Sequence, residues 1–512
     1  MHLKRKAFYI VLAAVAVAVL IAVYSPARAM SFVFDDQVTI IKNQKIQAAS
    51  FTKAIVENPF RSLVNLSFAF QVGLHRPEAP GEVVEYAPFQ SFLKLERKDR
   101  KKMQYYYEDP HSGKSGRVLP DMKRGYIYPL PRVLPFRAFN LFVHAVSSLL
   151  LGLLVFRLRP WKSAAFLTAV AFMFHPLATG SVNYITARFD LMAFAFCLAA
   201  VFFHLGADEK PRRDYIALGF FILGLFCKES AASLPVAVLL LDALRGRPRP
   251  RVLFALALSA LYVVLRLQWM IVLDSPEMEK PAFTAYVLME QRVFWIYLAK
   301  CFCPLHLNFE YSIGAKTVTD AAFALLNGAA LAAAGAAAAA KFLSLRSPDK
   351  KGLRNLGAKL KGPASQVVLI FAIGWVLLSP TLLIPLADSA EEHRAYPLIG
   401  VAMAGLFGGL LPLVLAEQKR KRTVMAVAAA IVVVFAIMSF NRNQDWKNEL
   451  TLLADSMKKS PHKPRLVYNY ADELKWHGRF DRALFWYKRH LEMEPGREDT
   501  RLMIKLLEDR TE

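Results

Sequence analysis

Two adjacent carboxylates, Asp35 and Asp36, follow the first apolar segment of the chain, which runs from Ala7 to Tyr24. If this segment crosses a membrane, both side chains lie at the boundary between water and lipid, on the side opposite the N-terminus. Partial burial at such a boundary makes a carboxylate a stronger general base. Because two carboxylates at short range do not both ionise without cost, we expect one to act as the base and the other to pair with a cation or with the acceptor. The alternative is that the pair only caps a short helix.

Cationic groups stand at the ends of later apolar segments. Arg188 and Asp190 begin one segment, and Lys228 and Glu229 lie between two short ones. Arginine donates two parallel hydrogen bonds to phosphate oxygens, so Arg188 suits a lipid-linked phosphate. Lys228 would contact the same phosphate, with Glu229 orienting it. The alternatives are a snorkelling arginine beside a capping aspartate, and a self-neutralising pair at a hairpin tip.

Three further positions carry groups that could bind a substrate. His175 precedes a proline at the end of an apolar segment, where its ring either binds substrate or bonds the carbonyls that the proline frees. A second cluster, Glu392, His393 and Arg394 with Tyr396, fits either a phosphate site or a solvated loop. Arg61 is either a headgroup contact or a charge on an interfacial helix.

Long uncharged segments predict an all-α integral membrane protein. The chain has 512 residues, of which 55% are hydrophobic. About eleven apolar segments approach the roughly 20 residues that a helix needs to cross the hydrocarbon core. These segments are 7–24, 136–156, 162–178, 188–206, 214–227, 230–245, 252–273, 320–343, 366–386, 395–416 and 423–440.

The distribution of basic residues predicts the orientation. The net charge is +24, and the basic residues concentrate in alternate short loops, which the positive-inside rule places in the cytoplasm. The N-terminus would then be cytoplasmic in a multi-pass plasma (inner) membrane, and the C-terminus extracytoplasmic. The polar clusters described above would all face outward. Cleavage after Ala29, in a segment that also resembles a signal peptide, would remove the first crossing.

Two outer loops are long. The first, 25–135, holds the amphipathic stretch Phe51 to Leu74, which we expect on the membrane surface, and a charged part, 96–124, which we expect to be a mobile or docking segment. The second, 274–319, holds the aromatic stretch Tyr286 to Phe302, which we expect at the interface.

The composition changes after Phe440. We therefore predict a membrane domain over 1–440 and a small helical domain over 441–512. Residues Pro464 to Pro495 fit one tetratricopeptide repeat (TPR), with Ala471, Gly478, Ala483 and Tyr487 at its small, turn, small and aromatic positions. Because one repeat cannot bury its own face, we expect flanking helices at 444–459 and 499–509. A plain helical hairpin is the alternative.

Several motifs are absent from the sequence: a Walker loop, a Rossmann glycine pattern, His-Glu-x-x-His and Gly-x-Ser-x-Gly. Soluble nucleotide chemistry and membrane proteolysis of those types have no support. The four cysteines suit neither a disulfide staple nor a zinc knuckle, and the basic residues are better explained by a membrane than by nucleic acid.

An ordered set of motifs resembles a known family. The acidic pair is followed by Phe60-Arg61-Ser62-Leu63, by Asn140 and His144, by His175-Pro176 and by Thr186-Ala187-Arg188-Phe189-Asp190. Lys228-Glu229-Ser230, Glu392-His393-Arg394-Ala395-Tyr396-Pro397 and a terminal TPR complete the order. The chain resembles the transmembrane-and-TPR-containing (TMTC) protein O-mannosyltransferases and their bacterial relatives, within the GT-C glycosyltransferases. It differs from them at Phe189, at Ser62 and in having a very short TPR array.

The resemblance implies a GT-C fold and an inverting transfer of a sugar from a polyprenyl-phosphate carrier to a Ser/Thr hydroxyl of a protein on the outer face. Because the leaving phosphate is already a stable anion, one carboxylate base and a few cations suffice. We expect Asp35 to be the base, assisted by Asp36, and Arg188, Lys228 and Arg394 to hold the phosphate. No cofactor is certain, although an aspartate pair also suits a divalent cation.

Other functions remain open at this stage. The enzyme could instead glycosylate lipid or polysaccharide, or move a whole oligosaccharide. A flippase for lipid-linked sugars predicts polar residues at the midplane and internal repeats, neither of which is evident. A scaffold that assembles partners through its TPR would leave the acidic pair and the outer cations unexplained.

Overall fold

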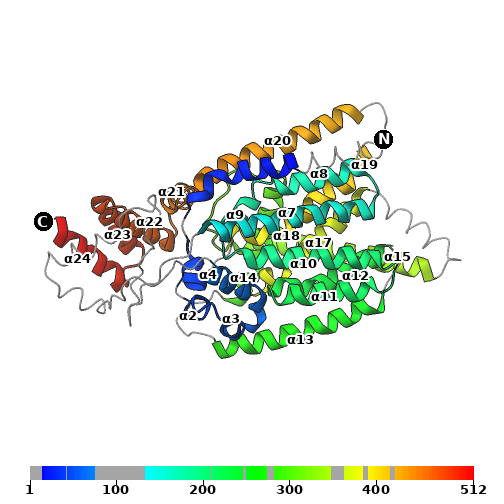
Figure 1. Ribbon diagram of the computed structural model, residues 1–512, viewed down its shortest axis with the longest axis horizontal. Coiled ribbons are helices and arrows are strands. Elements are labelled where there is room, and N and C mark those ends of the chain that lie inside the picture. The colour runs from blue at the N-terminus through cyan, green and yellow to red at the C-terminus, as the bar shows by residue number, and fades with distance from the viewer. Residues whose placement is uncertain are drawn as a thin grey trace. The chain divides into compact units, whose positions relative to one another are not determined.

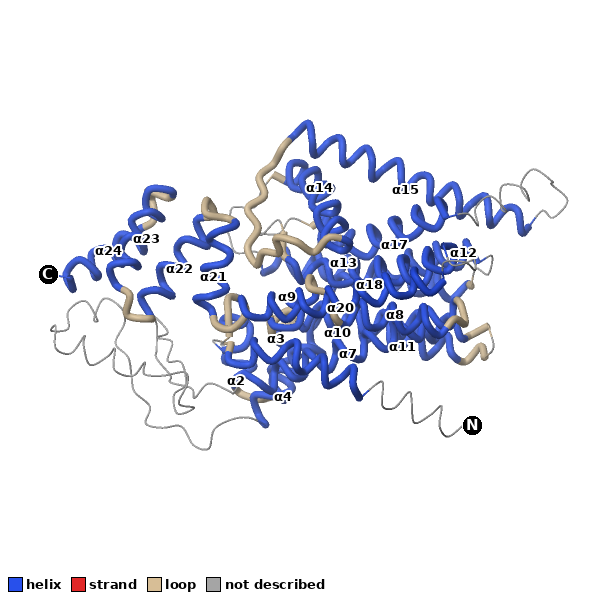
Figure 2. The backbone as a smooth tube through the Cα atoms, turned by 90° about the horizontal axis from the view of Figure 1, so that it is seen from above, coloured by secondary structure: helices blue, strands red, loops and turns tan. Residues whose placement is uncertain are grey.

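The computed structural model describes residues 14–30, 32–41, 43–74, 133–208, 210–245, 249–273, 282–346, 363–384, 390–414 and 421–511. Over this part of the chain the secondary structure is 84% helix, and it includes no strand, as the tube in Figure 2 shows. The predicted all-α fold class is confirmed at this level. The charged segment 96–124 lies outside the described residues.

The chain divides into two compact units. The first combines residues 1–31 with 137–512, and the second consists of residues 32–136. The predicted boundary at 440 stays a prediction, and helix α20, Lys421–Asp445, runs through it without a break.

Figure 1 shows the helices of the first unit coloured in chain order. Its first half contains α7 (Val133–Leu158), α8 (Lys162–Met173), α9 (Ala178–Asn183), α10 (Arg188–Gly206), α11 (Arg213–Leu225), η5 (Glu229–Ser233), α12 (Leu234–Arg245) and α13 (Pro250–Leu273). Its second half contains α14 (Phe283–Phe302), α15 (Thr317–Arg346), α17 (Pro363–Leu383), η6 (Glu392–Ala395), α18 (Tyr396–Met403), η7 (Ala404–Leu410), α19 (Leu411–Val414) and α20.

Among the described residues, five helices are long and apolar enough to cross a membrane: α7, α10, α13, α15 and α20. The structure is thus consistent with an all-α membrane protein. In α10, 72% of the most apolar window is buried in the protein, against 17% in α13, α15 and α20. Helix α10 thus lies inside the bundle, while the other three present apolar side chains outward, as lipid-facing helices do. The count of eleven spans stays a prediction.

The chain reverses at the end of α8 because of a proline. Helix α8 ends at Met173, just before His175 and Pro176, and a proline cannot continue the hydrogen-bond ladder. The short α9 then leads back to Arg188, the first residue of α10. This reversal places Arg188 and Asp190 at the start of the most buried span.

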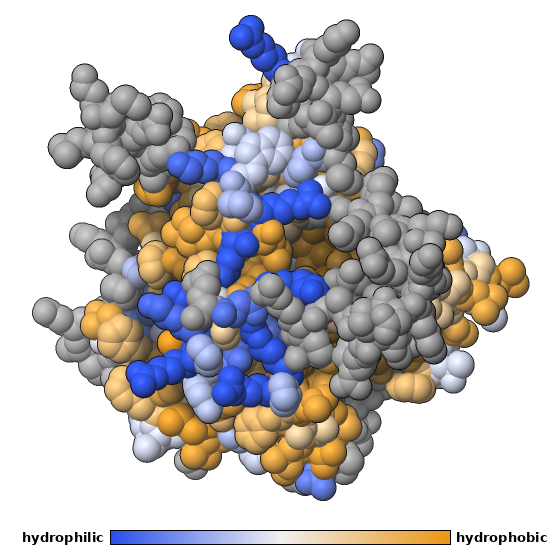
Figure 3. All heavy atoms as spheres, turned by 90° about the vertical axis from the view of Figure 1, so that its right-hand side faces the viewer, coloured by the Kyte–Doolittle hydropathy of each residue, from blue (hydrophilic) through white to orange (hydrophobic). Residues whose placement is uncertain are grey.

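Basic loops meet at one end of the bundle. Arg213 donates to the carbonyl of Gly206 at 3.3 Å, and Arg245 pairs with Asp208 at 2.7 Å. His204 lies between Asp214 and Asp242, with ring nitrogens 3.1 and 3.0 Å from their carboxylates. Figure 3 shows hydrophilic residues gathered near the middle of this end, between apolar surfaces. Hydrogen bonds and ion pairs thus connect α10, α11 and α12 at this end.

Helix α14 differs from its prediction as an interfacial segment. It packs against α15, α17 and α18, and Tyr286, Phe294 and Tyr297 are buried. Its polar side chains are paired within the bundle: Trp295 donates to Asn327 at 2.7 Å, and the Tyr286 hydroxyl donates to the carbonyl of Thr381 at 3.0 Å. The polar residues that looked interfacial therefore bond neighbouring helices.

The second unit contains short helices: α2 (Gln44–Gln47), α3 (Phe51–Glu57), η3 (Pro59–Arg61) and α4 (Ser62–Leu74). The amphipathic stretch 51–74 is divided into separate helices after α3. Asn58 is extended, with φ −151° and ψ 96°, because a residue before proline avoids the helical region.

The C-terminal residues form α21 (Glu449–Lys459), α22 (Pro464–Trp476), α23 (Phe480–Met493) and α24 (Glu498–Thr511). Ala471, Ala483 and Tyr487 form the core between α22 and α23, and Leu507 of α24 joins it. Gly478 has φ +69° in the turn between them, a conformation that favours glycine. The hairpin and its flanking helices match the predicted layout, while its assignment as a TPR stays a prediction.

Candidate functional site

A buried ion pair joins α10 to the segment before α12. The ammonium of Lys228 lies 2.8 Å from both carboxylate oxygens of Asp190. The two residues are 8% and 4% exposed, so neither charge is well hydrated. Lys228 is extended and immediately precedes η5, which aims its side chain back toward the start of α10.

The segment 391–394 completes this group. The Nε2 atom of His393 lies 3.8 Å from Asp190 and 3.5 Å from Glu391, and Arg394 pairs with Glu391 at 2.7 Å. We call Asp190, Lys228, Glu391, His393 and Arg394 the charged cluster. The charged cluster combines four residues from three groups that the sequence analysis proposed separately, and it adds Glu391.

Electrostatics set the protonation states in the segment 391–394. Burial by itself would raise the pKa of Glu391, but the positive charge of Arg394, joined by that of His393 when its ring is protonated, outweighs burial and lowers that pKa to about 2. Burial lowers the pKa of His393, which favours the neutral imidazole. At neutral pH the cluster therefore contains an ionised Glu391 beside an uncharged His393.

Arg188 is fully buried at the start of α10. Its Nε donates to Asn140 Oδ1 at 2.8 Å, and its guanidinium lies 4.6 Å from the centre of the Phe139 ring. The amide of Asn140 in turn donates to the carbonyls of Val182 and Tyr184 at 3.3 Å. Helix α7 therefore fixes the direction of Arg188 through one amide and one ring.

Glu392 points to a separate network. Its Oε1 accepts from the backbone N–H of Asn308 at 2.5 Å and from the Tyr311 hydroxyl at 3.1 Å. Its Oε2 lies 3.6 Å from Arg442, and a methyl group on Gly180 would come within 3.4 Å of that oxygen. Burial raises the pKa of Glu392, against the opposite effect of Arg442. Glu392 thus bonds protein groups and is not part of the charged cluster.

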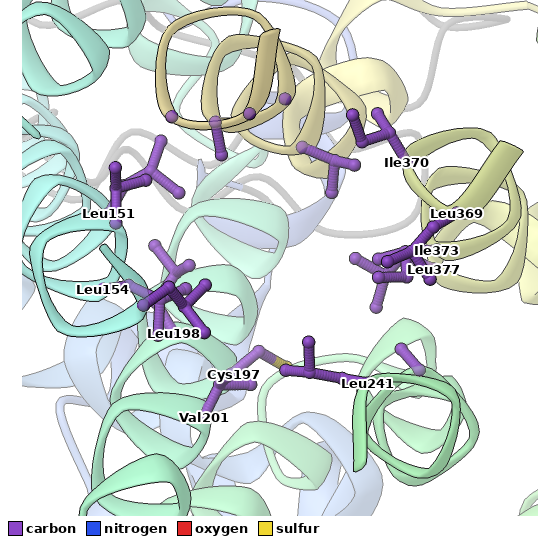
Figure 4. Close-up of a pocket in the computed structure, with 18 of the residues that line it drawn as sticks. Leu151, Leu154, Cys197, Leu198, Val201, Leu241, Leu369, Ile370, Ile373 and Leu377 are labelled. Atoms are coloured by element: carbon purple, nitrogen blue, oxygen red, sulfur yellow. The ribbon is translucent and has the colours of Figure 1, made fainter. Parts of the chain in front are cut away.

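An apolar pocket of about 310 Å³ lies among α7, α10, α12, α17 and η7 (Figure 4). Leu151 and Leu154 line it from α7, Cys197 and Leu198 from α10, and Leu241 from α12. The side of α17 contributes Leu369, Ile370, Ile373 and Leu377. Figure 4 shows these side chains, which carry carbon and one sulfur, pointing toward a common space, and Arg159, just after α7, also lines the pocket. Such a space takes hydrocarbon in preference to water.

The pocket begins a few residues after three members of the charged cluster. Along α10 the first lining residue after Asp190 is Phe194, and at about 1.5 Å per residue it lies roughly 6 Å along the helix. After Lys228 the first lining residue is Leu234, beyond η5, and after Arg394 it is Val401, beyond η6. The charged cluster therefore lies toward one end of the pocket, and Arg159 also lines the pocket.

A π-helix contributes to the pocket wall. Helix α18 continues into η7, where Gly405, Gly408 and Gly409 line the pocket. π-helical turns are rare and are frequent at functional sites. The small residues leave room that larger side chains would fill.

Three predicted site residues are engaged in other contacts. His175 accepts from the backbone N–H of Leu177 at 3.2 Å and bonds the carbonyl of Cys301 at 2.9 Å, so both ring nitrogens are used. The Tyr396 hydroxyl lies 2.7 Å from His144 in a buried aromatic group. Both side chains hold helices together, and the carbonyl that His175 bonds belongs to α14. Glu229 is half-buried at the start of η5.

The acidic pair belongs to the second unit and its two members differ. Asp36 is fully buried, and its Oδ2 accepts from the backbone N–H of Val33 at 3.2 Å, so it caps the local turn. Asp35 is exposed, so neither carboxylate has the expected partial burial. Phe34 has φ +47°, an unusual value for a bulky residue, and such strain is concentrated at functional sites. Arg61 ends η3 and is half-buried.

Among the described residues, no group of three or more His, Cys, Asp or Glu side chains has a metal-binding arrangement. Sequence reasoning missed Glu391, Asn308 and Arg442. Arg442 stands at the end of an apolar segment, as Arg188 does, and the same signal could have identified it. Nothing in the sequence marks Asn308, because its role depends on a loop that packs against η6.

Comparisons with models of protein families, with curated proteins and with solved structures found no match to this chain.

Proposed function

We propose that this protein is a membrane glycosyltransferase that moves a sugar from a polyprenyl-phosphate carrier to a protein hydroxyl, with inversion at the anomeric carbon. The family resemblance of the sequence motivates the reaction, and mannose is the sugar that it implies. The proposal also takes the polar clusters and the C-terminal helices to be extracytoplasmic, as the positive-inside rule predicts.

The observation that carries the proposal is the position of the charged cluster at one end of an apolar pocket. A polyprenyl-phosphate sugar has the same division, with an anionic phosphate joined to a long hydrocarbon chain. The phosphate would bind near Lys228 and Arg394, and the first part of the chain would enter the pocket.

The balance of charge supports an anionic ligand. Within the charged cluster, Lys228 and Arg394 balance Asp190 and Glu391, and the buried Arg188, two residues before Asp190 on α10, adds one positive charge. The surplus of one positive charge matches the single negative charge of a sugar phosphodiester. When the bond between the sugar and the phosphate breaks, negative charge grows on the phosphate, and fixed cations stabilise that change.

Asp35 is the proposed base. The acceptor oxygen attacks the anomeric carbon, its proton passes to the carboxylate, and the phosphate leaves with the electron pair of the broken bond. The exposure of Asp35 suits contact with an acceptor from solution, whereas Asp36 is used to cap the turn. Asp36 would therefore assist by fixing the backbone next to the base.

Transfer can be measured directly with the full chain in lipid nanodiscs. Radiolabelled polyprenyl-phosphate mannose is supplied with envelope proteins as acceptors, and label is counted in the protein fraction. Label in protein supports the proposal. Label that enters only lipid or polysaccharide points to the other glycosyltransferase class. Donor that crosses liposomes without any transfer would replace the proposal with a flippase.

A further inference from the structure

Glu392 is held from two sides by residues that also hold the C-terminal helices. On one side is the loop after α14, which contains Asn308 and Glu310. On the other side is Arg442, near the end of α20. Both supports are buried. The loop also bonds the end of α21 and the start of α22, and Arg442 also bonds α21.

The loop after α14 makes several hydrogen bonds and ion pairs through two residues, Asn308 and Glu310. The backbone N–H of Asn308 donates to Glu392, while its side-chain amide donates to Ser460 Oγ at 2.8 Å. Glu310, only 2% exposed, pairs with both Lys463 and Arg465. Asn308 therefore joins η6 to the junction between α21 and α22, and the ion pairs of Glu310 lock that junction to the loop.

Arg442 forms the second support. Its Nη2 faces Glu392 at 3.6 Å, and its Nη1 donates to Asp455 of α21 at 2.7 Å and to Asp445 at 3.0 Å. Because a guanidinium is planar and rigid, movement of Asp455 changes the position of the group that faces Glu392.

The pKa of Glu391 gives separate evidence that the C-terminal helices lie close to the segment 391–394. The positive charge of Arg465, on α22, contributes to the lowered pKa of Glu391, in addition to the larger effects of burial, Arg394 and His393. A residue of the C-terminal helices is thus close enough to affect a member of the charged cluster.

We propose that Glu310 and Arg442 are positioning residues, through which α21 and α22 fix the segment 391–394 and so the charged cluster. The C-terminal helices then form part of the site. The expected effect on transfer rests on the proposed function, whereas the mechanical connection does not. The connection is mechanical because Glu391 and His393 are next to Glu392 in the chain and Arg394 follows directly. A shift of Glu392 therefore moves these three members of the charged cluster.

Hydrogen exchange of the full chain in nanodiscs tests the connection without any substrate. Glu310→Lys replaces attraction to Lys463 and Arg465 with repulsion. We expect faster exchange of the backbone amide hydrogens in 460–466 and also in 390–396. The triple variant Glu310→Lys, Lys463→Glu, Arg465→Glu restores the attraction with reversed signs, and we expect slow exchange to return in both segments. Faster exchange in 460–466 with no change in 390–396 would overturn the proposal.

The exposed pair Lys488 and Glu508, 2.7 Å apart, provides a matched control within the C-terminal helices. Glu508→Lys breaks that pair, and we expect no change in 390–396, since the pair joins α23 to α24 and both side chains are about half exposed. If Glu310→Lys does not fold, Glu310→Gln keeps the shape of the side chain and removes its charge, and the same two segments are read.

Transfer kinetics separate the two proposals. We expect Glu310→Lys to raise the KM for the donor about tenfold, equivalent to ~1.4 kcal/mol, and the triple variant to recover most of it. If Glu310→Lys speeds exchange in both segments but the wild-type chain transfers no sugar, the positioning role stands and the glycosyltransferase is refuted. Normal donor KM in Glu310→Lys, with coupled exchange, would show that the connection does not position the cluster.

Discussion

The ammonium of Lys228 lies 2.8 Å from each carboxylate oxygen of Asp190, and this buried contact joins the start of α10 to the segment before α12. The two residues are far apart in the sequence, where Asp190 stands near Arg188 and Lys228 stands beside Glu229. Their pairing connects the two ends of the α10–α11 hairpin where the charged cluster is built.

Replacing Lys228 with methionine would leave the Asp190 carboxylate buried without this partner. Breaking a buried pair in this way costs about 3–5 kcal/mol of stability. We expect a clearly lower unfolding temperature in detergent, with Lys228→Arg as the control that keeps the charge. Equal unfolding temperatures for wild type and Lys228→Met would contradict the pairing.

Glu391 makes stability depend on pH on the acid side. Its pKa falls from 4.5 to about 2 on folding, so its stabilising effect is complete above pH 4.5 and is lost as pH falls toward 2. The variant Glu391→Gln lacks this effect. We expect it to be less stable than wild type at neutral pH, with the difference shrinking toward pH 2. A series of unfolding temperatures across this range checks the prediction, and a gap that stays constant would refute it.

Filling the apolar pocket should weaken binding of the hydrocarbon chain. Ala237, on α12, lines the pocket and is buried, and phenylalanine there would occupy much of the space. We expect Ala237→Phe to bind polyprenyl phosphate about tenfold more weakly. The control is Leu261→Phe, since Leu261 is 55% exposed on α13 and does not line the pocket. Unchanged binding in Ala237→Phe would exclude the pocket as the chain site.

The opposite end of the bundle supports stability and should not support transfer. Asp242 is fully buried and holds His204 at 3.0 Å. We expect Asp242→Ala to lose about 3 kcal/mol of stability by the same argument as for Lys228. Transfer at a temperature where the variant stays folded should remain normal. A specific loss of transfer there would assign this end a role in the reaction.

The sequence predicts the helical class and most helix positions well, because apolar segments of sufficient length leave few other structures. It also predicts which span ends carry polar groups. It does not predict that Glu392 and Arg394, two residues apart, point into different networks, because this depends on the 3-10 turn of η6. It also does not separate Asp35 from Asp36, because only the fold shows that Asp36 is buried and accepts from Val33 while Asp35 is exposed.

The roles of His175 and of α14 show a second limit. Each looks like an interfacial or substrate-binding element from its polarity, yet its polar atoms bond the backbone or side chains of neighbouring helices. Local sequence shows that a polar group needs a partner, but only the tertiary packing shows whether that partner is the protein.

The most direct measurement of the central claim compares label transfer by wild type and by Asp35→Asn, side by side with the exposed control Asp481→Asn. We predict that wild type and Asp481→Asn place radiolabelled sugar on protein, while Asp35→Asn binds polyprenyl phosphate normally and transfers none. Wild-type transfer by Asp35→Asn would contradict the assignment of the base, and no transfer by the wild-type chain from any polyprenyl-phosphate sugar would contradict the glycosyltransferase itself.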